Sequence, residues 1–506
     1  MYTLQIPDKI IKHYNLNEMA DHGVVYAKLN KKYGRRRTRL RAHKRFGEIL
    51  HTGGYRETTT KGFYTHKSRD ISFTLVYNNL GVKYKDTADI EHLAKTLESY
   101  YEFELEHFCN RYANLTLDWD YDARTVRCSM PGYVEKVLME LNFPRPKRKR
   151  ESPSKDVPLV YGQKMQYANT DKTRPLSDEE ITDVKRITKR FHYYANAVDA
   201  TMLHALDDIN CKVSEGIATA DTLEALKFFL SYASWNTDAS ILFRASDMIL
   251  RIDSDGAHLV FPRSRSRAGG YHYLGDKDGT IFNAPIRVLT KLIPLVTASA
   301  AETELHSVCQ NAFRGLVLRD ILRDMGHPQD TTPIKTDNST VNGIIDKSMK
   351  ARYLKADSNR LKWIREKVDE GIFEVHWESA KTNLADYPTK HHSPTHHRTV
   401  RPIYTYQYNQ SPTTMQGCVN MLEGLAKTRH PAAKAAAQAP AKQEVAKKRS
   451  CNAGKPASTC TNEEENASLH KGASALAALQ NGPTKKQRSA KGPRALPLQP
   501  ISTYIR

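Results

Sequence analysis

The chain has 506 residues, and its 77 lysines and arginines against 56 aspartates and glutamates give a formal net charge of +21 at pH 7. This length is enough for two or three ordinary domains with cores of their own. The excess of cations recurs along the chain and favours a polyanionic partner, nucleic acid above all. A basic surface without a binding role is the alternative interpretation.

Cysteine usage and hydropathy argue against a secreted or membrane-inserted protein. The seven cysteines form no Cys-x-x-Cys pair and have no histidine at zinc-ligand spacing. We therefore expect reduced thiols and an intracellular location, in the nucleus or the cytoplasm. Residues 1–15 lack the apolar stretch of a signal peptide, and no segment approaches a membrane span, so we expect no membrane partner.

Three changes of composition divide the chain. Residues 144–158, PRPKRKRESPSKDVP, are rich in proline and charge, and a weaker break falls at residues 231–240. Beyond about residue 412 the chain is rich in Ala, Lys, Gly and Pro, and such a segment buries too little apolar surface to fold. We therefore expect four parts: residues 1–143, a linker and helical connection over 144–240, a domain over 241–400, and a disordered basic tail over 401–506.

The densest basic run of the folded part is KYGRRRTRLRAHKR, residues 32–45. As a helix it would spread cations around most of its circumference. Contact with a phosphate backbone and a merely solvated helix are both consistent with this pattern. The candidate nucleic-acid-binding residues are Arg35, Arg36, Arg37, Arg39 and Arg41.

The next segment, ISFTLVYNNLGVKYK (residues 71–85), contains two apolar runs joined by Asn78 and Asn79. Asparagine tolerates left-handed backbone angles, so the pair predicts a β-hairpin. Hairpins of this shape also carry paired carboxylates at the tip in nucleotide-polymerising enzymes. The asparagines are therefore either an ordinary turn or the remains of a lost metal site.

The remaining pattern predicts strands and helices in a definite order. Residues 115–138 predict two strands and a helix, and residues 176–230 are mainly helical. From residue 244 several strands come first, followed by a long helix over about 300–325 and then alternating strands and helices. This is the order of a mixed α/β sheet with flanking helices.

Carboxylates lie where these later elements begin or end. Asp255 ends a predicted strand, before small residues that would let backbone approach a ligand, and Asp337 ends the short strand PIKTD. Asp386 lies at the start of a predicted helix. Each residue taken alone fits a surface charge or a helix cap equally well.

A fourth carboxylate requires a choice between neighbours on the long helix. Ser299 and Glu302 have the spacing of a capping box, in which the glutamate folds back to the backbone. That arrangement would leave Glu304 to project elsewhere.

The stretches TDNSTVNGIIDKSMKA, IREKVDEGIFEVHW and NLADYPTKHH resemble the RNase H region of copia-type retrotransposon Pol polyproteins, with SDGAHL and SAAETEL in the right order upstream. The resemblance implies an RNase H fold whose four carboxylates bind two Mg²⁺ or Mn²⁺ ions. Mg²⁺ prefers oxygen ligands, and two ions about 4 Å apart can assist cleavage of one phosphodiester. The implied substrate is the RNA strand of RNA–DNA hybrids. Carried onto this sequence, the catalytic and metal-binding set is Asp255, Glu304, Asp337 and Asp386.

The upstream half resembles the later reverse-transcriptase part of the same polyprotein, with palm, thumb and connection. The resemblance rests on GGYRETTTKGFYTHKSRDISFTLVYNNLGVKY, LDWDYDARTVRCSMPGYVEKVL and FHYYANAVDATML. Family members carry an Asp-Asp pair where this sequence has Asn78 and Asn79, and an asparagine offers a metal ion only a neutral oxygen. The segment with the family's earlier palm aspartate would precede Met1. We therefore expect polymerase activity to be lost.

Two further features bear on the RNase H interpretation. Pro388 stands where relatives usually have phenylalanine, and proline in the later turns of a helix costs about 3 kcal/mol or more. The run HHSPTHHRT, residues 391–399, is interpreted as a polar exit from the last helix, because no carboxylate or cysteine stands at tetrahedral-site spacing. The rivals to a nuclease are a repurposed protein that binds nucleic acid without cutting it and a relic without a stable fold. Oligomeric state is not predicted.

Overall fold

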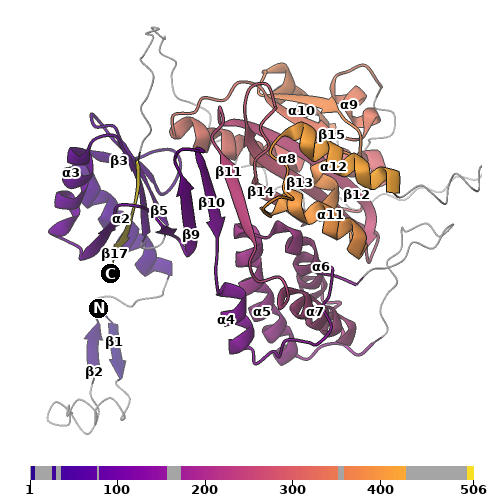
Figure 1. Cartoon of the computed structure of the whole chain (residues 1–506), viewed down its shortest axis with the longest axis horizontal. Helices are drawn as coiled ribbons and strands as arrows, with labels where there is room; N and C mark the ends of the chain where they lie inside the picture. The colour runs from indigo at the N-terminus through magenta and orange to yellow at the C-terminus, as the bar shows by residue number, and fades with distance from the viewer. Residues whose placement is uncertain are drawn as a thin grey trace, which may run out of the picture. The chain divides into compact units, whose positions relative to one another are not determined.

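The computed structural model describes residues 2–5, 26–29, 36–76, 79–155, 173–350, 358–428 and 499–505 (Figure 1). These residues belong to one compact unit, formed by Met1–His430 and Leu498–Arg506. In the described ranges, no helix combines the length and the hydropathy needed to cross a membrane. Sheets and helices alternate along the chain, which confirms the predicted mixed α/β class.

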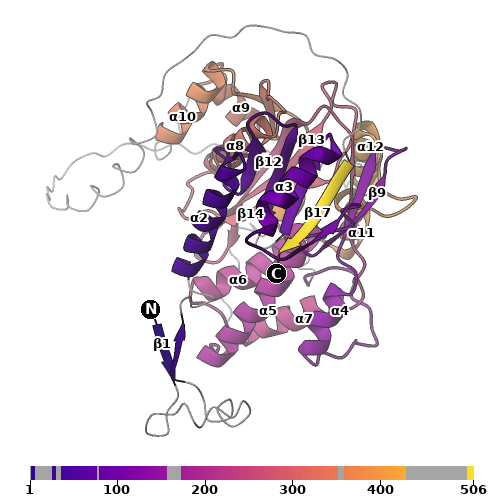
Figure 2. The ribbon, with the colours of Figure 1, turned by 90° about the vertical axis from the view of Figure 1, so that its left-hand side faces the viewer.

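The N-terminal elements form a short two-stranded ladder and an antiparallel sheet of order β3-β4-β5-β6-β17-β7. Helices α2 and α3 cover one face of this sheet (Figure 2). Phe73 and Val82 of the sheet pack there against Leu50 and Leu93 of the helices. The elements are β1 (Tyr2–Gln5), β2 (Tyr26–Leu29), α2 (Arg36–Thr52), β3 (Tyr55–Glu57), β4 (Phe63–His66), β5 (Ile71–Val76), β6 (Asn79–Tyr84), α3 (Thr87–Glu98), β7 (Phe103–Glu106) and β17 (Gln499–Ile505).

The predicted hairpin is confirmed, although its turn is shifted by one residue. Val76 of β5 pairs with Asn79 of β6, so the loop consists of residues 77 and 78. Asn79 is therefore the first residue of a strand, and Asn78 lies outside the described residues. Asn79 is partly buried, and its side-chain oxygen has no hydrogen-bond partner among the described residues.

The basic run contributes to α2, which includes the backbone of Arg36, Arg37, Arg39 and Arg41. Arg35 lies outside the described residues. The run is therefore helical from Arg36 onwards, and its contact with phosphates stays a prediction.

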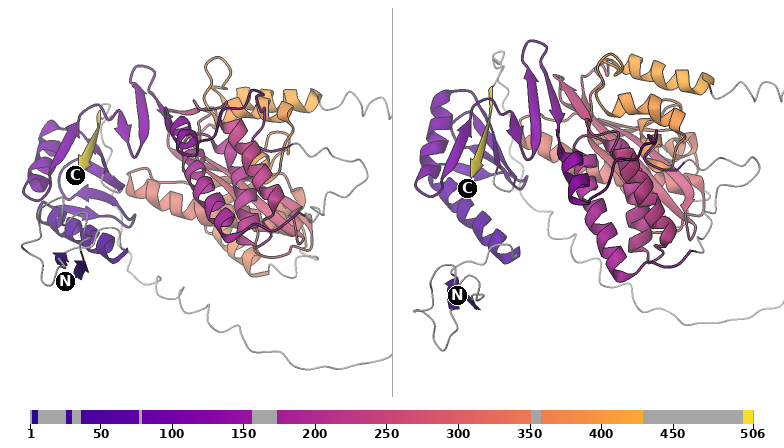
Figure 3. Two further views of the ribbon diagram at one scale, coloured as in Figure 1. Left: turned by 90° about the horizontal axis from the view of Figure 1, so that it is seen from below. Right: turned by 60° about the horizontal axis from the view of Figure 1, so that its bottom comes forward.

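A second antiparallel sheet joins segments that are far apart in the sequence. Its order is β11-β10-β9-β8, and Cys128 of β10 pairs with Ile241 of β11. Between these two strands the chain forms a helical bundle with Phe191, Leu206 and Phe229 in its core, seen from two further directions in Figure 3. The elements are β8 (Arg111–Tyr112), β9 (Leu115–Asp120), β10 (Thr125–Ser129), α4 (Tyr133–Glu140), α5 (Asp178–Ala197), η2 (Ala200–Met202), α6 (Leu203–Ser214), α7 (Ala220–Ala233) and β11 (Ser240–Arg244).

The third sheet is mixed and has the order β14-β13-β12-β15-β16. Strands β12, β13 and β14 are antiparallel neighbours, whereas β15 and β16 run parallel to β12. Leu305, Val308 and Ala312 of the long helix α8 pack on this sheet against Ile252 and Ile334. The elements are β12 (Ile249–Phe261), β13 (Arg265–Gly275), β14 (Pro285–Leu292), α8 (Ala300–Asp324), β15 (Thr332–Thr336), α9 (Ser339–Ile345), α10 (Ser358–Asp369) and β16 (Phe373–Trp377).

The chain then forms η3 (Leu384–Thr389), α11 (Pro394–Tyr404) and α12 (Met415–Thr428). The prediction of disorder from residue 401 is wrong for the end of α11 and for α12. Cys418 and Leu422 of α12 are buried in the same core as the helical bundle. The prediction used the average composition of about a hundred residues, and such an average does not detect one short amphipathic helix.

The end of the chain also departs from that prediction. Strand β17 lies between β6 and β7 and is antiparallel to both. Residues 429–498 of the predicted tail lie outside the described residues.

Candidate metal centre

Asp255 lies within a strand and not at its end, because β12 continues to Phe261. Its partner across the ladder is Gly269 of β13. Gly256 follows, and a Cβ atom there would lie 2.9 Å from the Ser307 hydroxyl oxygen and 3.0 Å from the Thr303 backbone of α8. The missing side chain thus lets the first turns of α8 lie directly against the strand beside Asp255.

The first turn of α8 positions Glu304. The Ser299 hydroxyl caps the helix by accepting a hydrogen bond from the Glu302 backbone N–H at 3.1 Å. The Glu302 carboxylate turns back and accepts a hydrogen bond from the Ala298 N–H at 2.7 Å. The predicted structural role of Glu302 is therefore confirmed, and Glu304 is the carboxylate that faces β12.

Asp337 directly follows β15, whose Thr336 pairs with Ser254 of β12. The two strands are parallel, so Asp255 and Asp337, each one residue after this pair, lie side by side on neighbouring segments. The Trp377 indole N–H donates to the Asp337 carbonyl at 2.9 Å and holds this backbone in place.

These three carboxylates converge. One oxygen each from Asp255, Glu304 and Asp337 lie within 4.8 Å of one another. Asp255 and Glu304 are each only 5% exposed. The Oε2 atom of Glu304 is buried without a hydrogen-bond partner among the described residues.

Burial and mutual repulsion determine the protonation of this cluster. Burial, followed by the negative charges of Asp386 and Asp337, raises the pKa of Asp255 to about 7. Burial and the charge of Asp255 raise the pKa of Glu304 well above its ordinary value. Burial and the charge of Asp386 raise the pKa of Asp337. The three carboxyl groups disfavour one another's ionisation, and a cation bound between them would stabilise their ionised forms.

The cluster fits a hard divalent cation. All of its ligand atoms are oxygens, as Mg²⁺ or Mn²⁺ prefers, and Glu304 offers a buried oxygen that receives no hydrogen bond from the described residues. Asp255, Glu304 and Asp337 are therefore the residues that could hold such an ion.

Asp386 adjoins this group but does not belong to the trio. Its carboxylate is ion-paired with Lys390, which follows four residues later, directly after η3. Burial raises the pKa of Asp386, but the positive charges of Lys390 and His392 outweigh burial and hold the pKa below its ordinary value. No role for Lys390 is predicted from the sequence, because the i,i+4 pairing rule applies to α-helices and Lys390 follows a short 3₁₀ helix.

The segment η3, which carries Asp386, packs directly against strands β12 and β13 of the third sheet. The Thr389 hydroxyl donates to Asp255 at 2.7 Å. A Cβ atom on Gly269 would lie 2.3 Å from the Thr389 side chain and 2.6 Å from the Ala385 carbonyl, so only glycine lets η3 lie so close to β13. These contacts bring Asp386 beside the trio.

Pro388 is accommodated because the expected helix is a short 3₁₀ helix, η3, in which Pro388 is the last residue but one. Proline removes the N–H that would donate to the Leu384 carbonyl in an α-helix. The Tyr404 hydroxyl donates to that carbonyl instead. The loss caused by Pro388 is thus offset by a tyrosine from α11.

The histidine run lies closer to a carboxylate than its spacing suggested. One nitrogen each of His392 and His396 and an oxygen of Asp386 lie within 4.8 Å of one another. The two rings stack, with centroids 4.2 Å apart and planes inclined by 24°. Two histidines that share a metal ion direct the lone pairs of their ring nitrogens at one point. In stacked rings these lone pairs lie in two nearly parallel planes and do not converge. The arrangement does not favour a metal site, but the predicted polar exit is wrong for His396 and His397, which are buried on α11.

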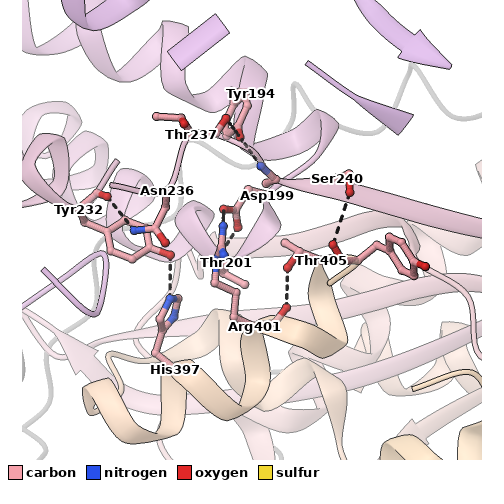
Figure 4. A network of polar contacts seen from close by, with 12 residues as sticks. Tyr194, Asp199, Thr201, Tyr232, Asn236, Thr237, Ser240, His397, Arg401 and Thr405 are labelled. Carbon is pink, nitrogen blue, oxygen red and sulfur yellow. Dashed lines mark hydrogen bonds and ion pairs between the residues drawn. The ribbon is translucent and has the colours of Figure 1, made fainter. Parts of the chain in front are cut away.

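A buried polar network holds α11 against the helical bundle (Figure 4). The His397 ring bridges the hydroxyls of Tyr232, at 2.8 Å, and Tyr387. Arg401 forms an ion pair with the fully buried Asp199 at 2.9 Å. Tyr387 directly follows Asp386, so this network fixes the backbone on which the fourth carboxylate stands.

No protein-family model matches the chain. A curated relative is the retrovirus-related Pol polyprotein from transposon TNT 1-94 of Nicotiana tabacum, which is 21% identical over 387 residues, or 74% of this chain. The chain spans 28% of the length of that polyprotein.

Similar solved structures include LC11-RNase H1 isolated from compost, at 13% identity over 28% of this chain and 93% of its own, with a TM-score of 0.23. Another is the prototype foamy virus protease-reverse transcriptase, at 12% identity over 43% of this chain and 26% of its own, with a TM-score of 0.20. Scores this low support no conclusion by themselves. The sequence match makes the chain similar to a part of a retrotransposon Pol polyprotein.

Proposed function

We propose that this chain is a fragment derived from a copia-type Pol polyprotein and that its third sheet carries a ribonuclease H activity. The reaction is hydrolysis of the RNA strand of RNA–DNA hybrids, dependent on Mg²⁺ or Mn²⁺. The observation that carries the proposal is the convergence of Asp255, Glu304 and Asp337 within 4.8 Å, with Asp386 beside them. The match to a retrotransposon Pol polyprotein supports the same assignment.

Each residue has a task in this proposal. Asp255, Glu304 and Asp337 would hold one ion, and Asp386 would contribute to a second. Bound ions supply Lewis-acid polarisation of the phosphodiester and a water of lowered pKa. Thr389 orients the Asp255 carboxylate through its hydrogen bond, and the Trp377 indole fixes the backbone of Asp337. Burial of Asp255 and Glu304 keeps bulk water away from their charges.

The reverse-transcriptase part is proposed to be inactive. Asn79 opens strand β6 with an amide, which supplies a neutral oxygen where a metal ion requires a carboxylate. Because amides do not ionise, no pH would restore the missing charge.

A second candidate function is binding of nucleic acid without cleavage. The Lys390–Asp386 ion pair favours it, because a lysine already neutralises the fourth carboxylate. In that case the chain would bind hybrids through its cations and leave them intact.

A cleavage assay separates the two functions. Purified chain is incubated with an end-labelled RNA–DNA hybrid and Mg²⁺ or Mn²⁺, beside the variants Asp255→Asn and Asp278→Asn. Asp278 is exposed and serves as the matched control for loss of one carboxylate. We expect cleavage by the parent and by Asp278→Asn but not by Asp255→Asn. Binding of the hybrid by the parent without any cleavage would replace the nuclease with the second candidate.

A further inference from the structure

The segment that the sequence indicated as a linker is packed against the helical bundle at its beginning. The Arg145 guanidinium lies 4.3 Å from the centre of the Trp235 ring. The indole N–H of the same tryptophan donates to the Pro146 carbonyl at 3.2 Å. A cation–π contact and a hydrogen bond thus hold residues 145 and 146.

The segment is held again a few residues later. The Arg150 guanidinium lies 4.7 Å from the centre of the Phe228 ring on α7. Glu151 forms an ion pair with Arg398 of α11 at 3.2 Å, and Ser152 is buried. The prediction of a linker is therefore wrong for residues 145–152, because these side chains find partners on α7, α11 and the following turn.

Between the two anchors lie Lys147, Arg148 and Lys149, all of them exposed. In the part of the chain that the structure describes, none of the three forms an ion pair with a carboxylate. In an unattached linker three adjacent cations could move apart in water. Here the anchors keep them together, and their mutual repulsion is relieved when anions bind.

The segment and the carboxylate site both adjoin helix α11. Glu151 contacts Arg398, and His396 on the same helix has a ring nitrogen within 4.8 Å of an Asp386 oxygen. Residues two positions apart point to different faces of an α-helix, so the two contacts join the segment and the site to one helix without making them neighbours.

We propose that Lys147, Arg148 and Lys149 bind the phosphate backbone of a nucleic-acid duplex. This inference rests on the proposed function for the identity of the ligand as an RNA–DNA hybrid. A duplex carries one charge per about 1.7 Å of its axis, so three adjacent cations can meet two or three phosphates. Contacts of this kind fix the register of a duplex and read no bases.

The test is the salt dependence of binding, measured by fluorescence anisotropy with a labelled hybrid in EDTA so that no cleavage occurs. The test variant is Lys147→Ala/Arg148→Ala/Lys149→Ala. The control variant is Lys185→Ala/Lys189→Ala/Lys362→Ala, which removes the same charge from exposed positions on α5 and α10. Circular dichroism and thermal melting establish that both variants are folded.

Each phosphate contact contributes about 0.9 to the slope of log K against log salt concentration. We expect the test variant to reduce the slope by about 2–3 and the affinity at 100 mM salt by roughly tenfold or more, and the control variant to change the slope by less than 1. Equal slopes for the parent and the test variant would overturn the inference. A loss of binding to anionic vesicles with unchanged binding to the hybrid would overturn it as well.

The outcome does not depend on catalysis. If the parent protein cleaves nothing but the test variant alone loses salt dependence, the proposed nuclease fails and the phosphate-binding segment stands. If cleavage is observed and the slopes are equal, the nuclease stands and the phosphate-binding segment fails.

Discussion

The ammonium group of Lys390 is ion-paired with the carboxylate of Asp386, four residues earlier in the chain. Burial lowers the pKa of Lys390, but Asp386 and Asp255 outweigh burial and raise that pKa, so the lysine stays charged at neutral pH. The protein therefore supplies a cation of its own beside a cluster of carboxylates that would otherwise repel one another.

Removal of this lysine is expected to strengthen binding of divalent cations. Lys390→Gln leaves Asp386 without its counter-ion and makes the cluster more negative. The added attraction between the carboxylates and the metal ion is about 1 kcal/mol at an effective dielectric constant near 20. This energy corresponds to a rise in Mn²⁺ affinity of about fivefold. Titration calorimetry with Mn²⁺ measures this effect, and Lys381→Gln, at an exposed lysine nearby in the chain, is the control. Unchanged or weaker Mn²⁺ binding by Lys390→Gln would contradict the role assigned to the ion pair.

Neutralising Glu304 is expected to stabilise the fold when divalent cations are removed. The pKa of this buried carboxyl is raised, so ionisation destabilises the folded state as pH rises above the unfolded value of about 4.3. At pH 8 in EDTA, Glu304→Gln should raise stability by about 1–2 kcal/mol, or the melting temperature by roughly 2–6 °C. The same variant should lose the rise in melting temperature that Mg²⁺ gives the parent. A lower melting temperature in EDTA than that of the parent would show that repulsion does not strain this site.

Acid is expected to destabilise the protein through buried histidines away from the carboxylates. Burial, reinforced by the positive charges of Arg287 and Arg314, lowers the pKa of His272 on β13 to about 4. The unfolded chain binds a proton there near pH 6.5, so this contribution to stability is present above about pH 6.5 and is lost as pH falls towards 4.

Inside that pH window, His272 alone lowers the free energy of unfolding by about 1.4 kcal/mol for each pH unit of acidification. Urea unfolding at pH 7, 6 and 5 measures the slope, and His272→Gln should make it smaller. A variant whose stability falls with acid as steeply as that of the parent would show that His272 is not responsible.

The buried ion pair between Arg401 and Asp199 is expected to be essential for the position of α11. Arg401→Met leaves Asp199 buried with its charge uncompensated, and such losses cost about 3–5 kcal/mol. Arg186→Met, which removes an exposed pairing with Asp183, should cost at most about 1 kcal/mol. Urea unfolding of both variants gives the comparison, and losses of similar size would mean that the buried pair adds nothing beyond a surface pair.

The sequence predicted the strands and the helix that carry the carboxylates. It did not predict how these elements are arranged relative to one another in the fold. The strand before Asp255, the capping sequence at Ser299 and the strand PIKTD are predicted from local signals, and the structure has a strand or a helix cap at each of these places. The convergence of Asp255, Glu304 and Asp337 depends on the parallel pairing of β12 with β15 and on the approach of α8 at Gly256. These are long-range contacts, and only a family resemblance could indicate them.

The departures from prediction share a physical cause. Residues 145–152 resemble a linker because proline and cations dominate their composition, yet their cations stack on Trp235 and Phe228, which lie far along the chain. Pro388 suggests a broken helix, yet a hydroxyl from Tyr404 supplies the donor that proline lacks. In both cases the compensating partner comes from a distant segment, so no local reading of the sequence could identify it.

The most direct test of the metal centre is binding of Mn²⁺ followed by electron paramagnetic resonance, with the parent compared with Asp255→Asn and Glu304→Gln. We expect the parent to bind at least one Mn²⁺ per chain and each variant to lose at least about tenfold in affinity. Equal binding by all three proteins would show that the ion lies elsewhere, and an absence of binding by the parent would show that the converging carboxylates hold none.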